Sequence, residues 1–255
     1  MDQFHLRTFL FANLLPDPKH SLILVYMPVK QHKLNLEVPR KWGGRQEGAG
    51  RPRGTNPKVL HRKRESFVAR HPIHVTFKVK KGLPSLRKAR FHRAFVQALA
   101  SACVRPGFKL IHYSLQDNHV HMLVEASDKK ALGNAMKSLI PRFARAVQRV
   151  FAVTGSVMFG RYHLRVLKTP KEVRNALAYV LLNARRHFFQ KHRRRPPVRI
   201  DALSSGALFN GWTGAIEIMS GSGPPLLTTH PDSWLLNKGW RRHKLIDPAE
   251  IPGCC

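Results

Sequence analysis

Two histidines separated by one residue have the clearest chemical potential in this sequence. His119 and His121 lie within residues 118–125, which read NHVHMLVE. The alternation of apolar and polar residues predicts a β-strand whose successive side chains point to opposite sides. Both imidazoles then face the same way from one rigid element, and neutral imidazole nitrogens are common metal ligands. The pair alone is a weak signal, because two histidines on an edge strand give the same pattern.

A tyrosine further along the chain is a candidate nucleophile. Residues 171–188 have helical periodicity, and their apolar side chains cluster within about 100° of arc. Tyr179 points about 140° away from the centre of that arc, and Asn183 follows one turn later on nearly the same side. If this helix lies across the histidines, it supplies a nucleophile and a third metal ligand together. The simpler alternative is a surface tyrosine with an ordinary hydrogen bond.

The charge of the chain points to a polyanionic partner. The 255 residues include 45 Lys and Arg against 14 Asp and Glu, a formal net charge of +31. Such a protein repels itself unless a polyanion neutralises it, and nucleic acid is the favoured partner. A ribosomal protein, a membrane-surface protein or a protein from a generally basic proteome is the alternative.

The cysteines and the apolar runs favour a cytoplasmic protein. Only Cys103, Cys254 and Cys255 occur, without the spacing of a disulfide framework or a zinc site. The apolar run at residues 22–29 is too short to cross a bilayer. Nothing near the start has the pattern of a signal peptide. We therefore expect a reducing compartment and no membrane partner.

The order of the predicted elements indicates an α+β fold. The strands and helices between residues 73 and 168 follow the order β-α-β-β-α-β, which matches the ferredoxin-like (split βαβ) antiparallel sheet. Val120, Met122 and Val124 then lie under two helices, while the histidines face the open side of the sheet. The helix at residues 171–188 is an additional C-terminal element that is free to cover that open face.

The flanking regions have a different composition. Residues 1–40 form an extension of unknown role, and residues 41–70 a basic linker rich in Gly, Arg and Pro. The Gly50-Arg51-Pro52 core of this linker, flanked by Arg45 and Arg53, resembles an AT-hook, a minor-groove binding segment, although Ala49 stands where an arginine usually precedes the glycine. A solvated basic linker is the equal alternative. We expect the catalytic domain at residues 71–190. The basic, irregular region at 191–255 packs on that domain or reaches beyond it.

Taken together, these features resemble the HUH family of single-tyrosine (Y1) transposases, the IS200/IS605-like enzymes and their REP-associated tyrosine transposase relatives. The resemblance spans residues 71–188 and rests on three stretches, 118–125, 159–162 and 178–183. The chain departs from the family where Gln116 and Asp117 replace the usual Met-Pro before the asparagine, and again after Asn183. Neither departure alters a reactive group, so they indicate a divergent branch.

The resemblance implies a mechanism and a set of partners. Tyr179 would attack a DNA phosphate and form a 5′-phosphotyrosine, and His119, His121 and Asn183 would hold one Mg²⁺ or Mn²⁺. The implied substrate is single-stranded or hairpin DNA, cleaved and rejoined by a monomer or homodimer in a bacterial cytoplasm. The candidate contacts to the DNA backbone are arginines: Arg142, Arg145, Arg149, Arg161, Arg165, Arg185 and Arg186.

Several alternatives stay open at this point. His74 and His112 also fall on polar strand positions, where a structural role is favoured, and Glu125 could add a ligand. Tyr162 is the rival nucleophile. At the level of function, a non-catalytic nucleic-acid-binding protein on the same fold competes with the transposase, and so does an endonuclease of the nickase or replication-initiation type.

Overall fold

The computed structural model describes residues 65–214 and 227–253. All of them belong to the compact unit Thr55–Cys255. The predictions for residues 1–40 and for the AT-hook-like Arg51 and Arg53 lie outside the described residues. No helix among the described residues is long and apolar enough to cross a membrane.

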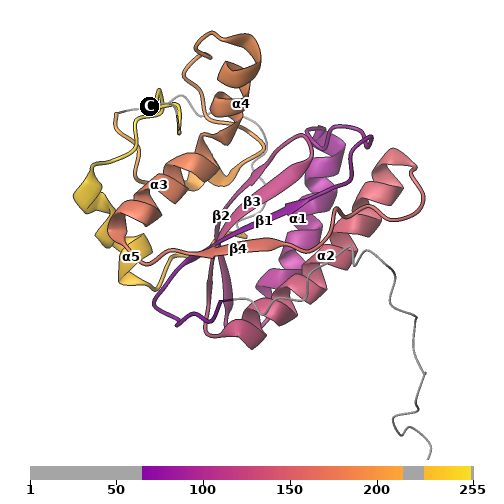
Figure 1. Ribbon diagram of the computed structural model, residues 1–255, viewed down its shortest axis with the longest axis horizontal. Helices are drawn as coiled ribbons and strands as arrows, with labels where there is room; N and C mark the ends of the chain where they lie inside the picture. Colours follow the sequence, from indigo (N-terminus) through magenta and orange to yellow (C-terminus); the bar gives the residue numbers. More distant parts are fainter. Residues whose placement is uncertain (1–64, 215–226, 254–255) are drawn as a thin grey trace, which may run out of the picture. The chain divides into compact units, whose positions relative to one another are not determined.

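The sheet has the predicted ferredoxin-like topology (Figure 1). Its strand order is β2-β3-β1-β4, and every neighbouring pair is antiparallel. Each of the two long helices connects strands that have another strand between them, which is the split βαβ arrangement. The α+β fold is therefore confirmed. The elements are β1 (Ile73–Lys78), α1 (Ala89–Cys103), β2 (Phe108–Leu115), β3 (His119–Ala126), α2 (Lys129–Phe151) and β4 (His163–Val166).

Helices α1 and α2 cover one face of the sheet (Figure 1). Val120, Met122 and Val124 of β3 are fully buried there, as their alternation predicts. Phe143 of α2 packs edge-to-face on Phe77 of β1, with ring centroids 5.0 Å apart. This first core fixes β1 and β3, and so it aims their alternate residues at the opposite face.

The helix expected at residues 171–188 is in fact two helices, α3 (Pro170–Leu181) and α4 (Asn183–His192). Thr169 and Glu172 form a capping box at the start of α3, which explains why the helix begins there. The break is at Leu182, where φ is −105° and ψ is 15°. The Leu182 carbonyl accepts from the N–H of Arg186 at 3.2 Å, so α4 begins directly where α3 ends. The periodicity alone did not predict this break.

The other face of the sheet is covered rather than open. Leu123 of β3 and Leu177 of α3 belong to a second apolar cluster, to which the C-terminal region contributes Trp240 and Ile246. That region contains the short elements η1 (Ser205–Leu208), α5 (Trp234–Asn237) and η2 (Gly239–His243). Of the two alternatives for residues 191–255, the described part packs on the domain.

Candidate active site

The histidine pair lies on the face of β3 that points away from α1 and α2. In the antiparallel register with β1, His119 is opposite Lys78 and His121 is opposite Thr76. Opposite residues of neighbouring strands point to the same side. The two imidazole centroids are 4.7 Å apart, and the rings are nearly perpendicular. The predicted shared orientation of the two histidines is therefore present.

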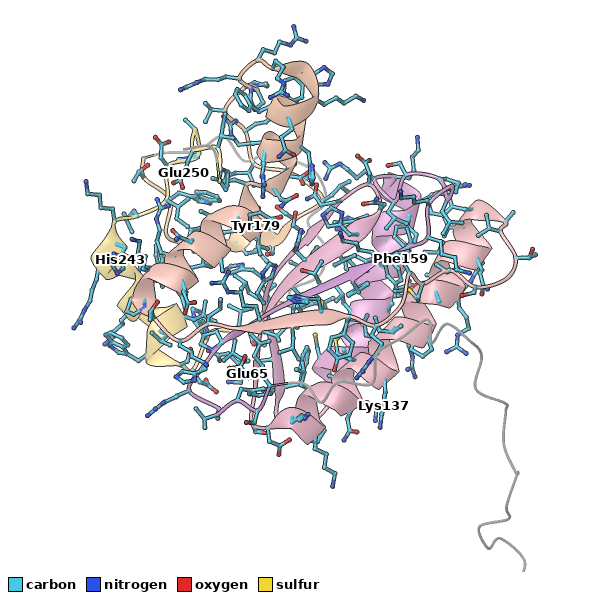
Figure 2. The ribbon with its side chains drawn as sticks, viewed as in Figure 1. Glu65, Lys137, Phe159, Tyr179, His243 and Glu250 are labelled. Carbon is cyan, nitrogen blue, oxygen red and sulfur yellow. The ribbon has the colours of Figure 1, made fainter. Side chains whose placement is uncertain are left out.

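Tyr179 of α3 lies against this pair. Its ring centroid is 5.1 Å from that of His121 and 5.9 Å from that of His74 on β1. Figure 2 labels Tyr179 where α3 meets the strands. The structure thus brings the candidate nucleophile and the histidines together, although they are almost 60 residues apart in the sequence.

Asn183 lies in the middle of a strip of side chains that crosses the histidines. Tyr179, Asn183 and His187 follow one another at intervals of four residues across the junction of α3 and α4. The first of them contacts His121, and the last has its ring centroid 5.5 Å from His119. Asn183 between them is fully buried, and neither its Oδ1 nor its Nδ2 has a hydrogen-bond partner. We did not predict His187, which one more step along the strip would have found.

Both histidines of the pair have one ring nitrogen engaged by the protein. The Nδ1–H of His119 donates to Asn118 Oδ1 at 2.7 Å. The Nδ1 of His121 lies 3.0 Å from both Thr76 Oγ1 and His74 Nε2. In contrast, the Nε2 of His121 is buried without a partner. A tautomer with hydrogen on Nδ1 satisfies these contacts and leaves Nε2 with a lone pair for a ligand.

The histidines of the site are neutral near pH 7. Burial, together with the charges that His74 and His119 would acquire, lowers the pKa of His121 to about 2. Burial also lowers the pKa of His119 to about 4, with smaller effects from His187 and Lys78. Burial, His163 and Arg165 lower the pKa of His74 to about 4. Neutral imidazole is the form that binds metal ions.

The donor set fits one divalent cation. No group of three or more His, Cys, Asp and Glu side chains suited to a metal ion occurs in the described part of the chain. A third protein donor beside the two histidines would therefore be the amide oxygen of Asn183. Three buried atoms without partners belong to this set: His121 Nε2 and both amide atoms of Asn183. Because buried polar atoms are normally hydrogen-bonded, these three indicate a missing ligand.

The remaining candidates have structural roles. Both oxygens of Glu125 accept backbone N–H groups, from Asp232 at 2.8 Å and from Ser233 at 2.9 Å, so this carboxylate holds the C-terminal region. The Nδ1 of His112 lies 3.1 Å from Ser205 Oγ. Tyr162 packs against the first core, which lies on the other side of the sheet from the histidine pair.

Two of the arginines on the histidine face are well placed for a polyanion. Arg165 of β4 is opposite His74 in the register; it is 64% exposed and pairs with Glu172 at 3.0 Å. The guanidinium of Arg186 lies over the Tyr179 ring, 5.0 Å from its centroid. Arg161 is exposed just before β4.

The other arginines are placed differently. Arg185 is 6% exposed and donates to the carbonyls of Pro196, Pro197 and Ala249. Its prediction as a DNA contact is corrected, because this guanidinium joins α4 to the C-terminal region. Exposed arginines of α2 lie over the opposite face of the sheet, where Figure 2 also labels Lys137: they are Arg142, Arg145 and Arg149.

Comparisons with solved structures give partial overlaps. A REP-associated tyrosine transposase bound to a REP hairpin overlaps 51% of this chain and 74% of its own, at 11% identity and a TM-score of 0.42. A proposed transposase from Deinococcus radiodurans overlaps 43% of this chain and 87% of its own, at 15% identity and 0.33. A bacterial tRNA-His guanylyltransferase-like protein in complex with ATP overlaps 50% and 63%, at 12% identity and 0.37. All three TM-scores are below 0.5, so these overlaps do not indicate a function.

The sequence comparisons are more decisive. No curated protein matches the chain. The model of the family described as "Transposase IS200 like" matches residues 67–166. This match includes His119 and His121 and ends with β4. It does not reach Tyr179 and Asn183, whose position beside the histidines comes from the structure. Residues 67–166, which hold the histidine pair, therefore match the IS200-like transposase family, as the motifs predicted.

Proposed function

We propose that this transposase-family protein cleaves and rejoins single-stranded or hairpin DNA through a covalent bond between Tyr179 and a 5′-phosphate. One observation supports this most strongly. The Tyr179 ring lies 5.1 Å from that of His121, whose buried Nε2 has no partner. A nucleophile beside unsatisfied metal-type donors is what phosphoryl transfer of this kind requires.

The proposed reaction conserves the number of phosphodiester bonds. The Tyr179 oxygen forms a bond to phosphorus while the bond from phosphorus to the 3′-oxygen breaks. The phenol loses its proton, and the departing 3′-oxygen gains one. The strand end with the 5′-phosphate stays on Tyr179. A 3′-hydroxyl can then attack the same phosphorus and release the tyrosine, which makes the reaction a strand transfer rather than a hydrolysis.

The side chains of the site would have separate roles. His119, His121 and Asn183 would hold Mg²⁺ or Mn²⁺, which when bound supplies positive charge to polarise the phosphate. Such a set has few oxygen donors, so binding would be weak without the phosphate of the substrate. The Nδ1 contact of His119 with the Asn118 oxygen fixes the tautomer of that ring, and the Nδ1 contacts of His121 orient its ring. Arg161, Arg165 and Arg186 would contact the DNA backbone, consistent with the formal charge of +31.

The experiment uses hairpin oligonucleotides with single-stranded flanks, labelled at one end or the other, incubated with Mg²⁺ or Mn²⁺ and separated on denaturing gels. We expect the 3′-labelled part to migrate with the protein and the 5′-labelled part to appear as a shorter free strand. Tyr179→Phe should abolish the adduct, and Tyr162→Phe should retain it. An adduct that survives Tyr179→Phe, or an adduct on the 5′-labelled part, contradicts the proposal.

The non-catalytic alternative has its own support in the structure. His121 is only 4% exposed, and the Arg186 guanidinium lies over the Tyr179 ring. DNA would have to displace this cover before the phosphate reaches the tyrosine. Tight binding of the hairpin without any adduct would favour this second function. An adduct that never transfers to an added 3′-hydroxyl strand would favour a nickase.

A further inference from the structure

A cavity beside the histidine pair takes no part in the proposed chemistry. Its volume is about 460 Å³, within the usual range for small-molecule sites. It lies between the β2–β3 turn, helix α4 and the segment at residues 196–203. His187 lines this cavity and also contacts His119, with ring centroids 5.5 Å apart. His187 therefore borders both the cavity and the candidate active site.

The lining combines an apolar part with charged groups. Leu181, Phe188 and Ile200 contribute apolar surface, and Phe188 is half-buried. The ring of His192 lies 4.5 Å from that of Phe188. An aromatic side chain beside an apolar surface is the usual platform for an unpaired base.

The charges of the lining are unevenly paired. Arg87 donates to both oxygens of Asp201, at 2.9 and 2.7 Å, so these two neutralise each other. Lys191 and Arg199 are exposed, and neither forms an ion pair with a described residue. Asp117 accepts from the Ser85 hydroxyl at 2.5 Å and is the remaining carboxylate. The buried Arg185 also lines the cavity and donates only to backbone carbonyls. The groups without an ion pair are thus three cations against one anion, which favours an occupant with a phosphate.

We propose that this cavity, here called the Phe188 pocket, receives one unpaired nucleotide of the DNA strand bound at the histidine pair. Its base would stack on Phe188, and its phosphate would lie between Lys191 and Arg199. The proposal rests on the proposed function for the path of the strand, because the shared His187 places the pocket next to the phosphate under attack. The pocket would hold the strand in place while Tyr179 reacts.

Photo-crosslinking of the full-length chain tests the location. The Tyr179→Phe variant, without divalent metal, is mixed with a 12-nucleotide oligodeoxythymidine that contains 5-iododeoxyuridine, irradiated, digested and mapped by mass spectrometry. We expect crosslinks at Phe188 or His192. Crosslinks that fall only outside residues 181–203 overturn the proposal. So does an equally efficient crosslink to 5-iododeoxyuridine monophosphate alone, because the pocket would then bind free nucleotides rather than a strand.

Binding measurements on matched variants test the chemistry. Phe188→Ala should weaken binding of the oligonucleotide about 5- to 100-fold, and Phe189→Ala, which is half-buried but outside the pocket, should change it less than 2-fold. Lys191→Gln with Arg199→Gln should weaken it about 10-fold and reduce the salt slope by about 1.4. The matched pair Arg193→Gln with Arg195→Gln, exposed but outside the pocket, should have a clearly smaller effect. Equal losses in pocket and control variants overturn the proposal.

The failure of this proposal can be told from failure of the proposed function. A chain that forms the Tyr179 adduct but does not crosslink in the pocket keeps its catalytic function and loses the pocket. A chain that crosslinks at Phe188 but never forms an adduct keeps the pocket and loses the strand-transfer function.

Discussion

The two faces of β3 differ in how their buried side chains are satisfied: one is packed with apolar groups, and the other contains a buried polar atom without a partner. On the face under α1 and α2, Val120, Met122 and Val124 are fully buried among apolar neighbours. On the other face, His121 is almost as deeply buried, but its Nε2 has no partner. Each buried polar atom without a partner costs about 1–3 kcal/mol. The first face therefore supplies stability, and the second leaves buried polar atoms without partners at the expense of stability.

The second face is itself divided. Next to His121 along the same face, Leu123 is fully buried in the cluster with Leu177 and Trp240. The histidine site is thus a polar region bordered by apolar packing, and this setting keeps water away from it. Burial is the largest cause of the lowered pKa of His121. The C-terminal region, which completes this second cluster, therefore helps to set the chemistry of residues far from it in sequence.

The largest expected effect is a loss of folding stability at low pH, which arises from the buried histidines of the second face. Burial lowers the pKa of His112 to about 4 and that of His121 to about 2, whereas an unfolded histidine titrates near 6.5. Between these values the unfolded chain binds more protons, so the stabilisation is complete above pH 6.5 and is lost as the pH falls toward 4. For two such groups the loss is on the order of 5 kcal/mol. Guanidinium unfolding without metal should show it, and His121→Leu should flatten the dependence. A midpoint unchanged from pH 7 to 4.5 would contradict the burial of these rings.

A large loss of stability should also follow from a cavity under the first face. Phe143 is fully buried against Phe77, and Phe143→Ala should lower the free energy of unfolding by about 3–5 kcal/mol. Phe159 is 66% exposed, so Phe159→Ala serves as the matched control, with an expected change within about 0.5 kcal/mol. Thermal and denaturant unfolding measure both. Similar losses for the two variants would mean that the first core does not dominate stability.

The difference between the faces also explains what the sequence could predict. Alternation along β3 determines which residues face the helices, and the order of elements determined the sheet topology. The strip of Tyr179 and Asn183 was visible because helical spacing is local. The burial of Arg185 depends on residues outside its helix: the carbonyls of Pro196, Pro197 and Ala249 accept from that guanidinium. Such contacts cannot be predicted from the periodicity of the sequence. For the same reason we predicted only a structural role for His74, because its proximity to His121 depends on the register of the sheet.

Helix α3 is tied to the C-terminal region by one partly buried ion pair. Arg174 donates to both oxygens of Glu250, at 2.6 and 2.7 Å, and the two side chains are 17% and 28% exposed. Glu250→Gln should reduce stability by about 1–3 kcal/mol, because it leaves a guanidinium partly buried without its charge partner. It should also slow adduct formation, because α3 carries Tyr179. The exposed pair of Lys168 and Glu65 provides the control, and Glu65→Gln should cost about 0–1 kcal/mol. Equal effects would show that the C-terminal region does not hold α3.

The smallest expected effect tests the support of the histidine pair itself. The Thr76 hydroxyl lies 3.0 Å from His121 Nδ1, so Thr76→Val should free this ring to rotate and to change tautomer. Affinity for Mn²⁺, measured by calorimetry in the presence of an uncleavable oligonucleotide, should fall about 10-fold. Thr76→Ser keeps the hydroxyl and should restore the affinity. The free energy of unfolding should change little for either variant, because the contact orients a ligand rather than filling the core. If Thr76→Val lost stability and kept its affinity for Mn²⁺, Thr76 would belong to the packing of the sheet, and the histidine face would be less distinct from the first core than we infer.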